Sequence, residues 1–197
     1  MAAHASKRTV PSGQGWRRYY WYGEDRSNGY DNSPGVHAYM STDLYNWTDL
    51  GVALRAVTSK SQLTDKSNAD YAYFDKAYNL TKSDGSVDAA KADAIFPYLN
   101  TNPDQDGDGA VDSVQGIFER PKIIYNKKNK QYVLWWHSDG STTPGGSNYA
   151  RALAGVAVSD NPAGPFTMVG AYRLPNQNNW KEAAGNPAGV RTVTAAI

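Results

Sequence analysis

Glutamate occurs only three times in the 197 residues, and two of the three follow aromatic or apolar segments that resemble strands. Glu24 ends the run Trp-Tyr-Gly-Glu, and Glu119 lies in the run Ile-Phe-Glu-Arg-Pro-Lys. A carboxylate at the end of such a segment is costly to bury unpaired, so it needs either a partner or a function. Glu119 could form an ion pair with Arg120, Lys122 or another basic residue. Alternatively, it could lie at the mouth of a sugar pocket and accept charge-assisted hydrogen bonds from ring hydroxyls.

A second group of candidate residues surrounds the run Trp-Trp-His that ends at His137. A single histidine on a strand is either a hydrogen-bonded structural residue or a base or ligand, and His4 and His37 show no metal-ligand spacing with it. Trp136 and Tyr149 offer flat faces on which a sugar ring could stack. Adjacent side chains of a strand point to opposite faces, so Trp135 and Trp136 cannot both face a pocket. We take His137, Trp136 and Tyr149 as candidate substrate-binding residues.

An acidic loop matches the first nine positions of a calcium-binding loop. Gly109 occupies the sixth position, which requires a sharp turn, and Gln115 stands at the twelfth position in place of a bidentate glutamate. The loop therefore predicts either a structural calcium site of lower affinity than a sensor site or a solvated acidic turn. The candidate ligands are the carboxylates of four aspartates and one backbone carbonyl: Asp104, Asp106, Asp108, Ala110 and Asp112.

Composition excludes several classes of function. The net charge is +1, from 20 basic and 19 acidic residues, so nothing favours nucleic acid or an anionic membrane as a partner. No apolar run is long enough for a membrane helix, and the start of the chain has no apolar stretch of the length of a signal peptide. Cysteine is absent, which excludes disulfides and thiolate metal sites. No nucleotide-binding loop or nucleophile elbow occurs, so no cofactor is required beyond a possible structural calcium.

The elements that must position these residues are short strands arranged in two similar units. Residues 18–51 and 115–174 each contain a strand rich in aromatic residues, then a turn-rich segment, then a strand of small residues, then a short strand. A repeated antiparallel unit of this kind is typical of propeller blades. We therefore predict an all-β fold of about two blades, with an insertion at residues 54–114 and an irregular tail at residues 175–197.

The insertion differs from the two units in composition. Residues 68–79 and 87–99 are rich in alanine, lysine and aspartate and predict two helices, with Ser86 as the N-cap of the second. The acidic loop follows the second helix. The insertion is therefore expected to be helical and to end in the candidate calcium loop.

Several motifs resemble glycoside hydrolase family 43, and most closely its exo-β-1,3-galactanase branch. They are the aromatic strand that ends at Glu24, the segment 35–47, the segment 119–126, the strand 132–137 and the segment 148–166. The resemblance implies a five-bladed β-propeller, of which this chain is an N-terminal portion with about two blades and part of a third. It also implies hydrolysis of β-linked galactan side chains with inversion, by a protein located outside the cell or in the periplasm.

The resemblance also assigns roles to single residues. Glu119 matches the carboxylate that positions the terminal galactose, Glu24 matches a glutamate of the pocket wall, and Tyr149 matches a tyrosine that contacts the sugar. No segment matches the catalytic acid, and Glu182 lies in the tail and fits no family motif. We therefore expect this chain to be an interrupted piece, from a fragmentary gene or a shifted reading frame, with little or no hydrolase activity.

Two alternatives remain open. The same aromatic and acidic residues would also serve a carbohydrate-binding protein that performs no catalysis. Within the family, a sister specificity such as that of an arabinofuranosidase or xylosidase fits the same motifs.

Overall fold

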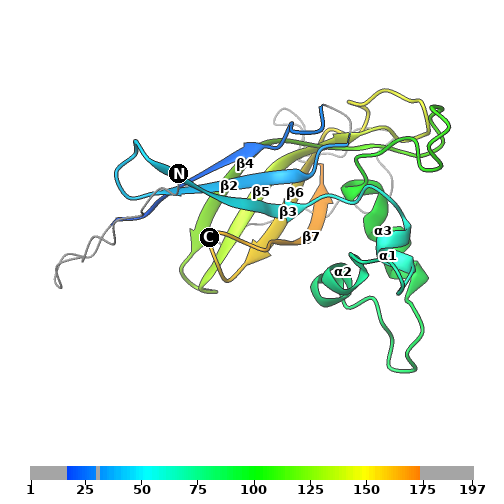
Figure 1. Ribbon diagram of the computed structural model, residues 1–197, viewed down its shortest axis with the longest axis horizontal. Coiled ribbons are helices and arrows are strands. Elements are labelled where there is room, and N and C mark those ends of the chain that lie inside the picture. Colours follow the sequence, from blue (N-terminus) through cyan, green and yellow to red (C-terminus); the bar gives the residue numbers. More distant parts are fainter. Residues whose placement is uncertain (1–16, 30–31, 174–197) are drawn as a thin grey trace, which may run out of the picture.

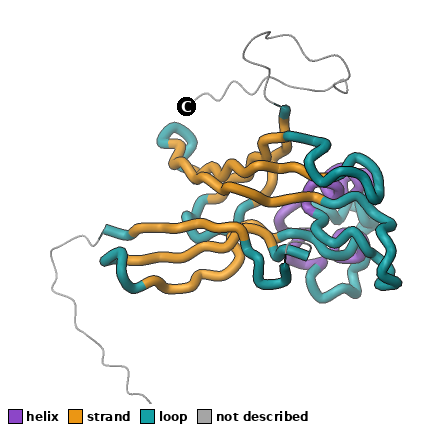
Figure 2. Tube along the Cα trace, turned by 90° about the horizontal axis from the view of Figure 1, so that it is seen from above, coloured by secondary structure: helices purple, strands orange, loops and turns teal. Residues whose placement is uncertain are grey.

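The computed structural model describes residues 17–29 and 32–173, and these form two antiparallel sheets and a small helical group. The first sheet has the order β1-β2-β3 and the second the order β4-β5-β6-β7. Figures 1 and 2 show the sheets as two separate layers, with the helices gathered at one end. The strands of the first sheet are β1 (Tyr19–Glu24), β2 (Gly35–Ser41) and β3 (Trp47–Arg55). Those of the second are β4 (Gly116–Asn126), β5 (Gln131–Gly140), β6 (Leu153–Ser159) and β7 (Thr167–Tyr172).

The predicted fold class is confirmed. Neither sheet closes on itself, and each is a meander of neighbouring strands, which is the arrangement of two blades of an incomplete propeller. The sequence pattern placed the end of the first unit at residue 51, whereas β3 continues to Arg55. The tail at residues 175–197 and Glu182 lie outside the described residues.

The insertion between the sheets forms three helices, α1 (Ser61–Thr64), α2 (Tyr71–Tyr78) and α3 (Ala89–Leu99). The expectation that Ser86 caps the last helix is wrong. Asp88 is the N-cap, because its carboxylate accepts a hydrogen bond from the backbone N–H of Lys91, 3.1 Å away. Ser86 instead donates from its hydroxyl to Asp84 within the preceding turn.

A single hydrophobic cluster joins both sheets to the helices. Its fully buried members come from the first sheet (Val36, Leu54), from the helices (Leu63, Phe74, Leu99) and from the second sheet (Phe118, Leu134). The two sheets and the helices therefore share one core. Among the described residues, no helix has the length and apolarity needed to cross a membrane.

Candidate functional site

The carboxylate of Glu119 lies at the centre of a cluster of polar side chains. Its side chain is 10% exposed, and one oxygen, Oε2, lies 3.1 Å from Nδ1 of His137. The hydroxyl of Tyr149 donates to the other oxygen, Oε1, at 2.9 Å. Glu119 and His137 are direct cross-strand partners on β4 and β5, so the sheet register itself brings them together.

Arg26 connects this cluster to the first sheet. Its guanidinium lies 2.9 Å from Oε2 of Glu24 and 3.7 Å from Oε1 of Glu119. Glu24 is the last residue of β1, and its other oxygen accepts a hydrogen bond from the backbone N–H of Arg120 at 2.9 Å. The two glutamates identified from the sequence therefore meet across the boundary between the sheets, with one cation between them.

A bulge in β4 makes this contact possible. The pairing of β4 with β5 shifts between Glu119 and Lys122, and Arg120 within the bulge has a φ of 52°. A β-bulge bends its strand and changes the direction of nearby groups, and positive φ is uncommon for residues other than glycine. Here the bulge directs the N–H of Arg120 toward Glu24 instead of toward β5.

Tyr149 forms the exposed wall of the cluster. It is 55% exposed, its ring lies stacked at 6.3 Å from the ring of His137, and its backbone forms an isolated bridge with Gly140 at the end of β5. A tyrosine held through its hydroxyl, with much of its ring accessible, provides an apolar surface beside a carboxylate. This combination suits a sugar ring, which has apolar C–H faces and polar edges.

The cluster also contains Asp139, a residue that the sequence analysis did not single out. Asp139 is 2% exposed, and its Oδ2 lies 3.0 Å from Nε2 of His137. It stands two positions after His137 on β5, and this spacing places both side chains on the same face of the strand. The same spacing relates Arg26 to Glu24. Asp139 and Arg26 thus each lie two positions after a predicted site residue, and this spacing is a signal that the sequence contains, although β1 ends at Glu24.

Trp136 does not belong to this surface, which corrects the expectation that it contacts substrate. Its side chain is 2% exposed, and its ring stacks on Phe118 with 5.6 Å between centroids and 7° between planes. His137 faces the cluster, so its neighbour on the strand faces the core. Trp136 therefore contributes to packing between β4, β5 and β6.

A similar arrangement of one imidazole and two carboxylates lies in the first sheet, next to Glu24. Nδ1 of His37 is 2.8 Å from Asp25 and Nε2 is 2.6 Å from Asp49. Partial burial acts to lower the pKa of His37, but the hydrogen bonds to the two carboxylates outweigh it and raise that pKa above 6.5. Burial likewise acts to raise the pKa of Asp25, but the hydrogen bonds from His37 and Ser27 outweigh it and lower that pKa below 3.8.

The acidic loop brings together three of its four aspartates. Carboxylate oxygens of Asp104, Asp106 and Asp108 lie within 4.8 Å of one another, whereas Asp112 accepts a hydrogen bond from the backbone N–H of Gln105. Gln115, the twelfth position, is buried and donates to the carbonyl of Thr101. Three converging oxygen donors are the kind of ligand that calcium prefers, so these residues fit the ion in part.

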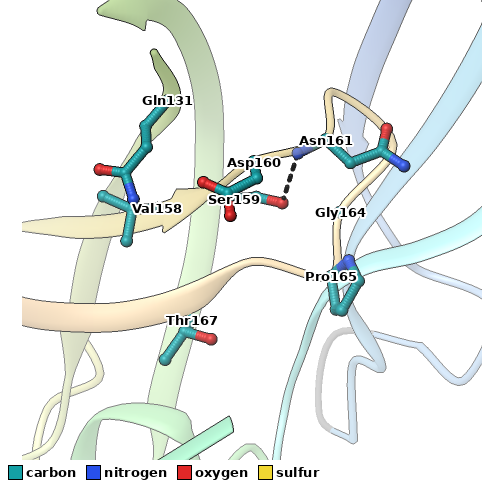
Figure 3. A pocket seen from close by; sticks show the side chains of 8 residues that line it. All are labelled: Gln131, Val158, Ser159, Asp160, Asn161, Gly164, Pro165 and Thr167. Atoms are coloured by element: carbon teal, nitrogen blue, oxygen red, sulfur yellow. Dashed lines mark hydrogen bonds between the residues drawn. The ribbon is translucent and has the colours of Figure 1, made fainter. Parts of the chain in front are cut away.

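Two of the cavities lined by described residues lie outside the glutamate cluster. One, of about 240 Å³, separates the acidic loop from the segment 141–148 that leads to Tyr149. The other, of about 460 Å³, lies at the opposite end of the second sheet, and Figure 3 shows Gln131, Asp160, Asn161 and Thr167 around it. Gln131 and His137 are six positions apart on β5, which corresponds to roughly 20 Å along the strand. The larger cavity therefore contains none of the predicted site residues.

No family model matches the sequence, and no curated protein matches it. Among solved structures, the chain is similar to the exo-β-1,3-galactanase from Phanerochaete chrysosporium with β-1,3-galactotriose, at 27% identity and a TM-score of 0.48, over 82% of this chain and 24% of that chain. For the exo-β-1,3-galactanase from Clostridium thermocellum, the identity is 26% and the TM-score 0.47, over 83% and 23% of the two chains.

A third similar structure is a β-1,3-galactosidase of glycoside hydrolase family 43 with galactodeoxynojirimycin, at 27% identity and a TM-score of 0.48. That match covers 80% of this chain and 31% of the other. This chain thus spans about a quarter to a third of the length of these solved structures, and it is similar to glycoside hydrolases over most of its own length.

Proposed function

We propose that this chain provides one wall of the saccharide site of a glycoside hydrolase that cleaves β-linked galactan or a related plant polysaccharide. The observation that supports this proposal is the meeting of Glu24 and Glu119 around Arg26, with the hydroxyl of Tyr149 on Glu119. Two carboxylates from different sheets, next to an accessible aromatic ring, form a surface that can accept hydrogen bonds from several hydroxyls while a sugar face stacks on the ring.

In this site Glu119 is the substrate-positioning carboxylate. Its oxygens are oriented by His137, Tyr149 and Arg26, so a sugar hydroxyl meets an acceptor that is already held in place. An oriented acceptor binds with less loss of side-chain entropy than a mobile one. Glu24, fixed by Arg26 and by the N–H of Arg120, supplies a second acceptor beside it.

The same geometry argues against a proton-donor role for either glutamate. A cation between two carboxylates favours their action as hydrogen-bond acceptors, whereas an inverting hydrolase needs one carboxylic acid as donor and one group that activates water. Glu119 and Glu24 therefore position the sugar, and the acid of the proposed reaction is a different residue. Since the polymer is found outside cells, the proposed location is extracellular or periplasmic.

The test is saccharide binding and release by the full chain and two variants. Galactose and β-1,3-galactobiose are titrated into the wild-type chain, Glu119→Gln and Asp160→Asn, with binding followed by NMR and free galactose by chromatography. Asp160 lines the distant cavity of Figure 3, so its variant also removes one carboxylate but leaves the cluster intact.

We expect Glu119→Gln to weaken binding about tenfold to a hundredfold, the value of a hydrogen bond to a charged group. Asp160→Asn should bind like wild type. An absence of binding by wild type, or equal losses in both variants, would refute the proposal. If the chain, expressed together with any coding sequence that follows it, binds galactose and never releases it from galactan, the protein is a non-catalytic binder instead.

A further inference from the structure

The imidazole of His137 lies between two carboxylates that belong to different environments. Its Nδ1 faces Glu119 at 3.1 Å and its Nε2 faces Asp139 at 3.0 Å. Glu119 carries the candidate saccharide contacts, whereas Asp139 is a buried residue near the end of β5. The ring therefore connects a buried acceptor to the carboxylate at the surface of the site.

Asp139 is held more tightly than any other member of this cluster whose contacts are described. Its Oδ1 accepts three backbone hydrogen bonds, from Gly140 at 2.9 Å and from Arg151 and Ala152 at 3.0 Å each. These bonds join the end of β5 to the residues just before β6. With Oδ1 occupied by three donors, Oδ2 is the oxygen presented to His137.

This arrangement determines where the protons of His137 lie. Oδ2 of Asp139 makes an ion-pair contact with Nε2, and a carboxylate oxygen 3.0 Å away favours a hydrogen over a lone pair on that nitrogen. In a neutral ring Nδ1 would then be an acceptor, and it would face a second acceptor, Oε2 of Glu119. Two acceptors 3.1 Å apart require a hydrogen between them. That hydrogen lies either on Nδ1, which makes the ring an imidazolium, or on Glu119.

We propose that Asp139 is a positioning residue that fixes the N–H of His137 on Nε2 and thereby places one further proton between Nδ1 and Glu119. This proton immobilises Oε2, while Oε1 remains the oxygen that Tyr149 and Arg26 approach. The link to saccharide binding rests on the proposed function of Glu119. The proposed proton arrangement depends on the two contacts of His137 and not on saccharide binding.

The charged and titratable groups around the ring and its partner Glu119 come from four segments. Glu119 lies on β4, Asp139 on β5, and Tyr149 stacks on the ring from the loop that follows β5. Arg151, in the same loop, interacts electrostatically with Asp139, and burial lowers the pKa of its guanidinium from the ordinary value of an arginine. Arg26 reaches Glu119 from the end of the first sheet.

The test is the protonation state of each ring nitrogen of His137, read from long-range ¹H–¹⁵N spectra of the ¹⁵N-labelled chain. His37→Gln identifies the His37 signals, and neither this residue nor its partners belong to the cluster. In the wild-type chain we expect Nε2 to carry a proton. In Asp139→Asn, the amide oxygen keeps the three backbone hydrogen bonds, and the amide N–H₂ faces Nε2, so Nε2 should lose its proton and the ring should carry a proton on Nδ1 alone.

Glu119→Gln provides the second arm, which also decides the question if Asp139→Asn fails to fold. Here Asp139 is intact, so the ring should be neutral with its proton on Nε2. A proton on Nδ1 alone in wild type or in Glu119→Gln, or an unchanged Nε2–H in a folded Asp139→Asn chain, would overturn the proposal. Titration of galactose into the same samples separates the two claims, because absent binding with the expected proton shifts rejects only the saccharide site.

Discussion

The side chain of Glu24 accepts a hydrogen bond from the backbone N–H of Arg120, at 2.9 Å, although 96 positions separate the two residues. Glu24 is the last residue of β1, an edge strand of the first sheet. Arg120 lies in the bulge of β4, an edge strand of the second sheet. One carboxylate therefore links the two sheets at the candidate site. Arg26 then completes the contact on the other oxygen of Glu24 and extends it to Glu119.

Replacement of Arg26 should affect binding more than stability. Its side chain and that of Glu24 are both 31% exposed, and an ion pair of this exposure contributes about 1 kcal/mol or less. Arg26→Gln removes the cation that lies between the two carboxylates, so we expect galactose affinity to fall about tenfold. Arg26→Lys should restore it only in part, because an ammonium lacks the planar fork of a guanidinium.

The matched control for Arg26→Gln is Arg17→Gln, which replaces an exposed arginine just before β1. It removes the same charge without touching either glutamate. Urea unfolding and galactose titration of the three variants check the prediction. A loss of several kcal/mol in stability for Arg26→Gln would mean that the cation is primarily structural.

Gly155 should not tolerate even one added methyl group. A Cβ at this position would lie 2.2 Å from the ring of Trp136, which is packed in the core. Overpacking of this kind costs about 1–3 kcal/mol, so Gly155→Ala should lower the free energy of unfolding by that amount.

Gly23→Ala is the control for Gly155→Ala, since an added Cβ there meets nothing within 4 Å. Both glycines lie within strands, so the two variants change the backbone entropy of the unfolded chain alike. Denaturant unfolding followed by tryptophan fluorescence measures both. Equal stabilities would show that the Trp136 ring can move away from Gly155.

The His37 cluster should make stability depend on pH. The folded-state pKa of His37 is raised above 6.5, so its contribution is complete below pH 6.5 and is lost as the pH rises through the raised pKa. The pKa of Asp25 is lowered below 3.8, so its contribution is complete above pH 3.8 and is lost as the pH falls through the lowered pKa. The cluster therefore stabilises the fold fully between these two values.

His37→Gln measures this dependence. The difference in unfolding free energy between wild type and variant should be larger at pH 5.5 than at pH 9, because only the charged ring attracts both carboxylates. Lys128→Gln, at an exposed position of the turn between β4 and β5, should show no such pH dependence. A constant difference across this range for His37→Gln would mean that the ring acts through packing alone.

Calcium should stabilise the chain through the acidic loop. An ion that binds only the folded state at ten to a hundred times its Kd stabilises by about 1.4–2.7 kcal/mol. For a chain of this size that corresponds to a rise in Tm of about 2–4 °C for each kcal/mol. A chelator should reverse the rise.

Asp108→Asn is the appropriate variant for the calcium test. The asparagine oxygen can still accept from the N–H of Ala110, while the charge is lost. The control is Asp84→Asn, in the turn before α3, where the carboxylate accepts from Ser86 in the same manner. Equal calcium responses in wild type and Asp108→Asn would contradict a site in this loop.

The sequence alone determined the main elements and the chemistry available to them. Strand patterns, turn residues and insertion composition are local properties, and they predicted the two antiparallel units, the two longer helices and the acidic loop. The rarity of glutamate drew attention to Glu24 and Glu119, and these two do meet in space. Local signals sufficed here because each depends on residues only a few positions apart.

Only the tertiary structure decided how these residues combine. The sequence does not show which face of β5 packs against the core. The prediction that Trp136 faces the substrate is therefore wrong, and its ring is buried in the core. The choice of Asp88 over Ser86 as helix cap depends on the exact first turn of α3. Arg26 and Asp139 acquire their roles through contacts across sheets and loops, and no local pattern encodes the separation of two sheets.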